Sequence, residues 1–90
     1  MPYAAVELKL TLSVTQQRIL GKNPARQYAL LVNDGGDEIY LGMGIPAVIN
    51  RGIRLNNGGG SYEINLTNPW HGEIYAVAGA GTPALLVQEW

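Results

Sequence analysis

Hydrophobic and polar residues alternate near the start of the chain. Five aliphatic residues occupy every second position from Val6 to Val14, and polar residues fill the positions between them. A period of two places all five side chains on one face of a β-strand, whereas a helix would scatter them around its axis. The pattern therefore predicts a strand over residues 6–14.

Two further apolar segments are separated by a turn sequence. Tyr28–Asn33 is apolar at successive positions, which is typical of a strand covered on both faces, by its own domain or by a neighbouring subunit. Glu38–Met43 alternates, with Tyr40 opposite the aliphatic face. Because the intervening residues 33–37 are polar and rich in glycine, the two strands are predicted to form a hairpin.

The rest of the chain continues in short strands. Strands are predicted within residues 52–55, 62–67, 73–79 and 82–90, and residues 16–20 fit either a helical turn or a strand after a bulge. Residues 44–50 are predicted to be a loop or a short edge strand, because Pro46 cannot donate to a ladder. Seven or eight short strands with regular turn signals indicate a single all-β domain over residues 1–90. We expect an antiparallel β-sandwich, either Ig-like or jelly-roll-like.

Composition narrows the classes of function. The 90 residues contain no cysteine, which excludes disulfides, thiol nucleophiles and cysteine-ligated metals. A net charge of −1 argues against a basic surface for nucleic acid. The N-terminus lacks the uninterrupted apolar run of a secretory signal, and no stretch approaches the roughly 18–20 apolar residues of a membrane span.

The polar residues suggest no catalytic site. His71 is the single histidine and has no partner at a recognisable spacing. Asp34, Asp37 and Glu38 cluster in one turn, where aspartates commonly bond local backbone amides. The glycine run 58–60 lacks the lysine and the helix of a phosphate-binding loop. We therefore predict no catalytic, cofactor-binding or metal-binding residues, and a protein that is not an enzyme.

The aromatic residues are better candidates for a function. The chain has five tyrosines and two tryptophans but no phenylalanine, so every aromatic ring carries a polar group and suits an interface. Tyr40 and Tyr75 lie opposite the aliphatic faces of their strands and are predicted to point outward or toward a neighbour. Trp70 and Trp90 either cover an end of the sandwich or contact another subunit.

Arginine is a second candidate interface residue. Most of the positive charge is held by Arg18, Lys22, Arg26, Arg51 and Arg54. Arg51 and Arg54 are close in sequence, and such residues can pair bidentately with a carboxylate of the same chain or of a partner. Solvated surface charge is the alternative.

Residues 18–90 also resemble small β-sandwich proteins of tailed bacteriophage virions. The resemblance rests on segments that follow one another in order: Arg18-Ile19-Leu20, Asn23-Pro24, Val32-Asn33, Ile39-Tyr40-Leu41-Gly42, Gly59-Gly60-Ser61-Tyr62-Glu63 and Gly72-x-Ile74-Tyr75-Ala76. It implies a structural protein of the virion, made in the host cytoplasm. The small size favours a capsid decoration, or cement, protein over a head-fibre base or a tail part.

The resemblance also implies partners. A decoration protein would contact the major capsid protein and sister subunits, by analogy as a homotrimer, and would need no cofactor, nucleic acid or membrane. The alternative is a glycan- or receptor-binding module of a fibre or tail. In that case Trp70, His71 and Tyr62 would form a stacking platform.

Overall fold

The chain forms two antiparallel sheets packed face to face. The computed structural model describes residues 6–90, so the first five residues of the predicted domain lie outside it. In the described part, eight strands and no helix are present, which confirms the predicted β-sandwich. The strands are β1 (Val6–Thr11), β2 (Gln17–Leu20), β3 (Ala29–Asn33), β4 (Ile39–Met43), β5 (Ile53–Leu55), β6 (Ser61–Ile64), β7 (Ile74–Ala78) and β8 (Ala84–Glu89).

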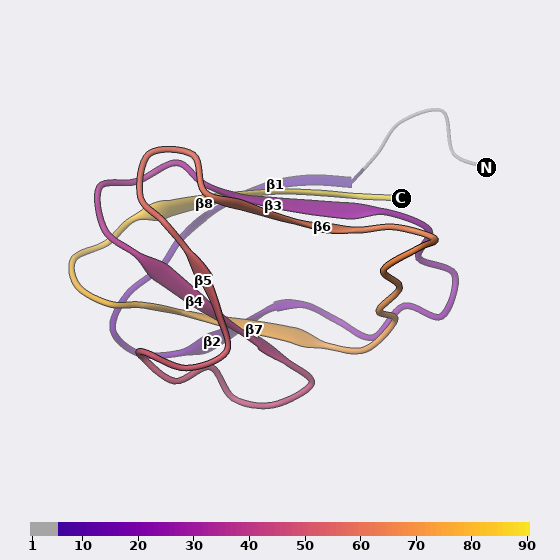
Figure 1. The fold of residues 1–90 in the computed structure, drawn as a ribbon, viewed down its shortest axis with the longest axis horizontal. Coiled ribbons are helices and arrows are strands. Elements are labelled where there is room, and N and C mark those ends of the chain that lie inside the picture. Colours follow the sequence, from indigo (N-terminus) through magenta and orange to yellow (C-terminus); the bar gives the residue numbers. More distant parts are fainter. Residues whose placement is uncertain (1–5) are drawn as a thin grey trace.

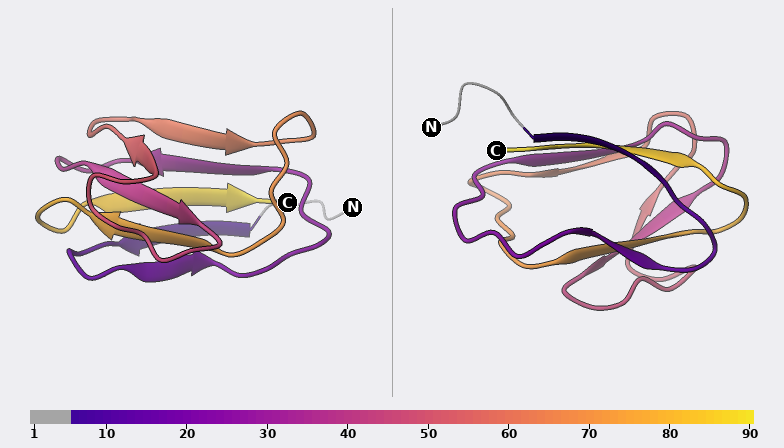
Figure 2. Two further views of the ribbon diagram at one scale, coloured as in Figure 1. Left: turned by 60° about the horizontal axis from the view of Figure 1, so that its bottom comes forward. Right: turned by 180° about the vertical axis from the view of Figure 1, so that it is seen from behind.

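The strand order is that of a jelly roll. The sheet with order β1-β8-β3-β6 lies above the sheet with order β2-β7-β4-β5 in Figure 1, and we call them the upper and the lower sheet. β1 pairs with β8, β2 with β7, β3 with β6 and β4 with β5, so the chain is one long hairpin folded over into two layers. The right-hand view of Figure 2 shows these layers from behind. The sequence left an Ig-like and a jelly-roll-like sandwich open, and this pairing of strands is that of a jelly roll.

The core fills the space between the sheets. Alternation along each strand sends every second side chain inward, as a period of two requires. The largest fully buried apolar side chains are Leu12, Leu31, Ile39, Leu41, Leu55, Ile64, Ile74, Leu85 and Val87. All of them are aliphatic, so the interior is held together by burial of apolar surface without aromatic packing at its centre.

The first strand is shorter than the alternation predicts. β1 ends at Thr11, and Val14, at the end of the predicted strand, is 59% exposed. The chain must leave the upper sheet here to reach β2 in the lower one. The Ser13 carbonyl already accepts a hydrogen bond from the backbone of Ala78 in the lower sheet (2.8 Å). Of the two alternatives for residues 16–20, the strand is right, since β2 pairs with β7 through a register shift.

The predicted hairpin between β3 and β4 is wrong. β3 lies between β8 and β6 in the upper sheet, whereas β4 lies between β7 and β5 in the lower sheet. The connection turns around the buried side chain of Asn33, whose Nδ2 donates to the carbonyls of Asp37 (2.7 Å) and Leu55 (3.0 Å) and whose Oδ1 accepts from the Gly35 amide (2.9 Å). Asparagine, aspartate and glycine favour a tight hairpin and a corner between sheets equally well.

The strand predicted over residues 62–67 also ends early. β6 stops at Ile64 because Asn65 forms a local turn, in which its Oδ1 accepts hydrogen bonds from the amides of Thr67 (2.9 Å) and Asn68 (3.0 Å). Leu66, which the alternation placed with Ile64, is consequently exposed.

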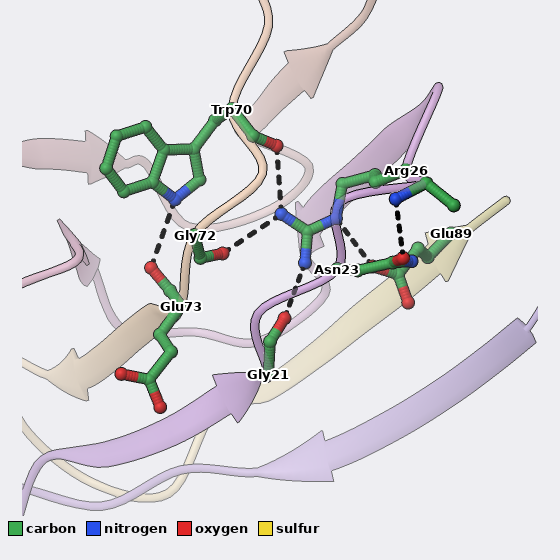
Figure 3. A network of polar contacts seen from close by, with 8 residues as sticks. Gly21, Asn23, Arg26, Trp70, Gly72, Glu73 and Glu89 are labelled. Carbon is green, nitrogen blue, oxygen red and sulfur yellow. Dashed lines mark hydrogen bonds and ion pairs between the residues drawn. The ribbon is translucent and has the colours of Figure 1, made fainter.

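A buried arginine closes the other end of the sandwich. The side chain of Arg26 has no exposed surface, and it donates to the carbonyls of Gly21 (2.8 Å), Trp70 (2.9 Å) and Gly72 (3.1 Å) (Figure 3). Its Nε forms an ion pair with Glu89 (2.5 Å). These partners belong to the β2–β3 connection, the β6–β7 connection and the end of β8. One side chain therefore supplies hydrogen bonds to three segments that are far apart in sequence.

No helix in residues 6–90 is long and apolar enough to cross a membrane.

The core assignment predicts the effect of two neighbouring substitutions. Ile64→Ala removes a side chain that is 2% exposed and should lower the free energy of unfolding by about 2–5 kcal/mol. Leu66→Ala, at a position that is 82% exposed, is the control and should change it by less than about 0.5 kcal/mol. Urea denaturation measures both. Equal effects of the two substitutions would contradict the register of β6.

The buried and the exposed ion pair are expected to contribute very different amounts to the free energy of unfolding. Arg26→Met removes the counter-ion of Glu89 and the donor of three carbonyls, and should cost about 3–5 kcal/mol of unfolding free energy. Arg18→Met breaks an ion pair whose arginine side chain is 59% exposed, and should cost less than about 1 kcal/mol. Denaturation curves of both variants test this. An Arg26→Met variant as stable as the wild type would show that the network contributes nothing.

Candidate functional site

The connection from β4 to β5 folds back onto the outer face of the lower sheet. We call residues 44–52 the β4–β5 loop; it is the curved segment below the lower sheet in Figure 1. Gly42 permits the close approach, because a side-chain carbon there would collide with the carbonyl oxygen of Ile45. Ala47 is buried against Tyr40 and Val77, with which it forms a small second apolar cluster. The loop is therefore anchored on the sheet by Ala47 and by the close approach of its backbone to Gly42.

Three aliphatic side chains of this loop remain in solvent. Ile45 is 64% exposed, Val48 51% and Ile49 37%, and we call these three residues the apolar tip. Exposed apolar side chains that are neighbours in one short segment are typical of a surface that contacts another molecule. Because Ala47 packs inward between them, the apolar tip is held in place rather than carried on a free loop.

Two predicted interface residues follow the apolar tip. Arg51 and Arg54 are both exposed, and together with Tyr40, Asn50 and Gly52 they line one depression of about 210 Å³. The structure thus brings together the two arginines that the sequence singled out, next to apolar residues that it did not.

Tyr40 is covered by its own chain. It lies on the outer face of the lower sheet, but the β4–β5 loop packs over it and leaves it 7% exposed. Its hydroxyl donates to Oδ1 of Asn50 (3.0 Å). This corrects the expectation that the ring faces solvent or a neighbouring subunit, and Tyr40 leaves the set of candidate interface residues.

Tyr75 belongs to a polar cluster on the same sheet face. Its hydroxyl donates to Glu73 (3.2 Å), which also accepts a hydrogen bond from Arg18 (2.9 Å). These contacts, that of Arg18 first, lower the pKa of Glu73 below its ordinary value of 4.5. Burial of the hydroxyl, with the bond to Glu73, raises the pKa of Tyr75. Glu73 is therefore ionised at neutral pH, so Arg18 has its counter-ion within the chain.

The outer face of the upper sheet carries a second apolar surface. Leu30, Val32 and Leu86 lie side by side on neighbouring strands, opposite the core-facing residues; we call these three residues the upper stripe. They line a shallow depression of about 470 Å³ together with Glu7 and Lys9 of β1. The stripe explains the continuous apolar run of β3: one face is in the core and the other is this half-exposed surface.

Trp90 lies at one end of the same face. It is 38% exposed and stacks on Tyr28, with ring centroids 4.4 Å apart and an interplanar angle of 22°. The Tyr28 hydroxyl donates to Glu63 (2.5 Å), and this bond to a carboxylate raises the pKa of Tyr28. Trp90 is therefore fixed within the chain and still presents part of its ring at the surface.

Trp70 covers an end of the sandwich, which is the first of the two alternatives. Its ring packs against the main core beside Gly44 and Gly72, and its Nε1 donates to the carbonyl of Glu73 (3.1 Å) (Figure 3). Tyr62 also packs against the main core, while His71 is exposed. These three residues therefore do not share an exposed stacking platform.

The predicted candidates are split among three places. The lower sheet and its loop hold Tyr40, Tyr75, Arg51 and Arg54; Trp70 lies at the end of the sandwich and Trp90 on the upper sheet. Sequence reasoning missed the apolar tip and the burial of Arg26. The sequence did contain a signal for the apolar tip. Its three aliphatic residues lie beside Pro46, which cannot donate to the hydrogen-bond ladder of a sheet, so their burial in a central strand was not to be expected.

Among residues 6–90, no group of three or more histidine and carboxylate side chains is placed to hold a metal ion. The predictions that the chain lacks catalytic, cofactor-binding and metal-binding residues stay predictions.

Within residues 6–90, the lower sheet thus carries an apolar tip and two arginines without an ion-pair partner, and the upper sheet carries an apolar stripe. Comparisons with protein-family models, with curated proteins and with solved structures found no match for this chain.

Proposed function

We propose that this protein is a structural component of a tailed-phage virion, most specifically a capsid decoration protein that binds the head through protein–protein contacts. The observation that carries the proposal is the apolar tip, Ile45, Val48 and Ile49, held on the lower sheet beside two arginines. The assignment to a virion is carried by the sequence resemblance over residues 18–90.

The charges suggest which face meets which partner. Arg51 and Arg54 have no ion-pair partner among residues 6–90, so two unpaired positive charges lie beside the apolar tip. Two copies of that face of the lower sheet would repel each other, which favours a partner of opposite charge. We therefore assign the β4–β5 loop to the major capsid protein.

The upper sheet is the better surface for sister subunits. The upper stripe is flanked by Glu7 and Lys9, which carry opposite charges. A surface that combines apolar area with both signs of charge can pair with another copy of the chain. We assign contacts within the proposed homotrimer to this face, with the exposed part of Trp90 at its end.

A glycan- or receptor-binding module is the second candidate. It has less support, because the ring of Trp70 packs inward and leaves His71 without the aromatic surface on which a sugar would stack.

The apolar tip predicts how the protein binds capsids. Ile45→Ser and Val48→Ser together should weaken cosedimentation with capsids that lack this protein by at least about tenfold, because each removes apolar area from the contact. Thermal unfolding should be unchanged, since both side chains are mostly exposed. Val14→Ser, at 59% exposure, is the matched control and should bind like the wild type. No binding by the wild type, or full binding by the double variant, would contradict the proposal.

The upper stripe predicts the oligomeric state. Light scattering should give the wild type the mass of three chains, and Leu86→Lys should shift it toward the mass of one, because a charge would enter an apolar contact. Leu66→Lys, at an exposed site on a turn, should keep the wild-type mass. If the wild type has the mass of a single chain, the assignment of this face to sister subunits is wrong.

A further inference from the structure

A small polar depression lies where the β4–β5 loop enters β5. Its volume is about 210 Å³, and its lining includes Asn50, Arg51 and Arg54. The backbone forms it with two left-handed residues on either side of Arg51, Asn50 (φ 66°) and Gly52 (φ 76°). Gly52 is required, because a side-chain carbon there would collide with the Leu41 carbonyl oxygen. Arg51 is thus presented on a defined turn.

Three side chains around this depression, those of Asn50, Arg51 and Arg54, can donate hydrogen bonds that no residue in the described part of the chain accepts. Arg18 and Arg26 each pair with a carboxylate, whereas no carboxylate in residues 6–90 lies within ion-pair distance of Arg51 or Arg54. Oδ1 of Asn50 accepts a hydrogen bond from the Tyr40 hydroxyl (3.0 Å). The amide Nδ2 of Asn50 is left free to donate, having no hydrogen-bond partner in the described part of the chain.

Two guanidinium groups and an amide donor around one hollow are suited to an oxyanion. A guanidinium binds carboxylate oxygens through parallel hydrogen bonds, and such charge-assisted bonds are among the strongest polar contacts in proteins. Neither Arg51 nor Arg54 has an ion-pair partner among the described residues, so an anion bound here would come from another molecule. Because the apolar tip ends one residue before Asn50, that molecule would present its anion beside apolar side chains, as a protein surface does.

We propose that Asn50, Arg51 and Arg54 form a carboxylate-binding site, filled by an Asp or Glu side chain of the protein on which the β4–β5 loop docks. This inference rests on the proposed function for the identity of the partner. The depression itself is a property of the free chain, so its ligand can be tested without a capsid.

The test is a titration of the free protein followed by NMR. The probe is the methylamide of N-acetylglutamate, and the signals are the Nε–H groups of Arg51 and Arg54 and the Nδ2 group of Asn50. We expect saturable shifts of these three signals, and no saturable shift with the neutral glutamine analogue. Arg54→Gln should weaken binding by about tenfold, through loss of one charge-assisted contact. Arg18→Gln, a similarly exposed arginine paired with Glu73, should not change it.

Three results would overturn the proposal. One is the absence of a saturable shift with the glutamate probe. Another is tighter binding of inorganic phosphate than of that probe, which would indicate a phosphate site. The third is cosedimentation with vesicles of phosphatidylcholine and phosphatidylserine that depends on Arg54, which would assign the arginines to a membrane surface.

The capsid assay separates this proposal from the proposed function. If Arg51→Gln and Arg54→Gln together leave capsid binding intact while the apolar-tip variant abolishes it, the carboxylate site is wrong and the proposed function stands. If glutamate binds the free protein as described but no variant or wild type binds capsids, the site stands and the proposed partner is wrong.

Discussion

Two buried polar side chains bracket β3, and the arrangement of the sheets depends on them. Arg26, just before the strand, donates hydrogen bonds to three segments at one end of the sandwich, and Asn33, its last residue, holds the turn at the other end. Loops that cross between sheets leave backbone groups without ladder partners, and burial makes such groups costly unless they are satisfied. Because these hydrogen bonds satisfy the backbone at both ends of the sandwich, an aliphatic core is sufficient to hold the two sheets together.

The sequence predicted the strands far better than their partners. Alternation is a local property, so it identified most strands and the sandwich class. Pairing depends on contacts between distant residues: the turn after Asn33 has the composition of a hairpin, yet it leads β4 into the other sheet. Val14 and Leu66 continue the alternation beyond the strands, but the chain turns away at both places. The Ser13 carbonyl pairs with Ala78 in the other sheet, and the Asn65 side chain closes a local turn with the amides of Thr67 and Asn68.

The candidate site was predicted only in part, for a related reason. Arg51 and Arg54 are close in sequence, so their proximity could be inferred, and the structure adds that neither has a carboxylate partner in residues 6–90. Tyr40 was placed on the correct face, but no local pattern indicates that a loop covers that face. The covering follows from Gly42 and Ala47, whose small size lets the loop lie close and leaves its aliphatic residues exposed.

We have proposed that the loop face of the lower sheet meets the capsid. Amide hydrogen exchange of the capsid-bound protein, compared with the free protein, tests this proposal most directly, because it needs no substitution and reports on every segment at once. The account predicts that residues 45–54 become protected on binding. Protection confined to the turns at 56–60 and 79–83, with residues 45–54 exchanging as fast as in the free protein, would contradict it.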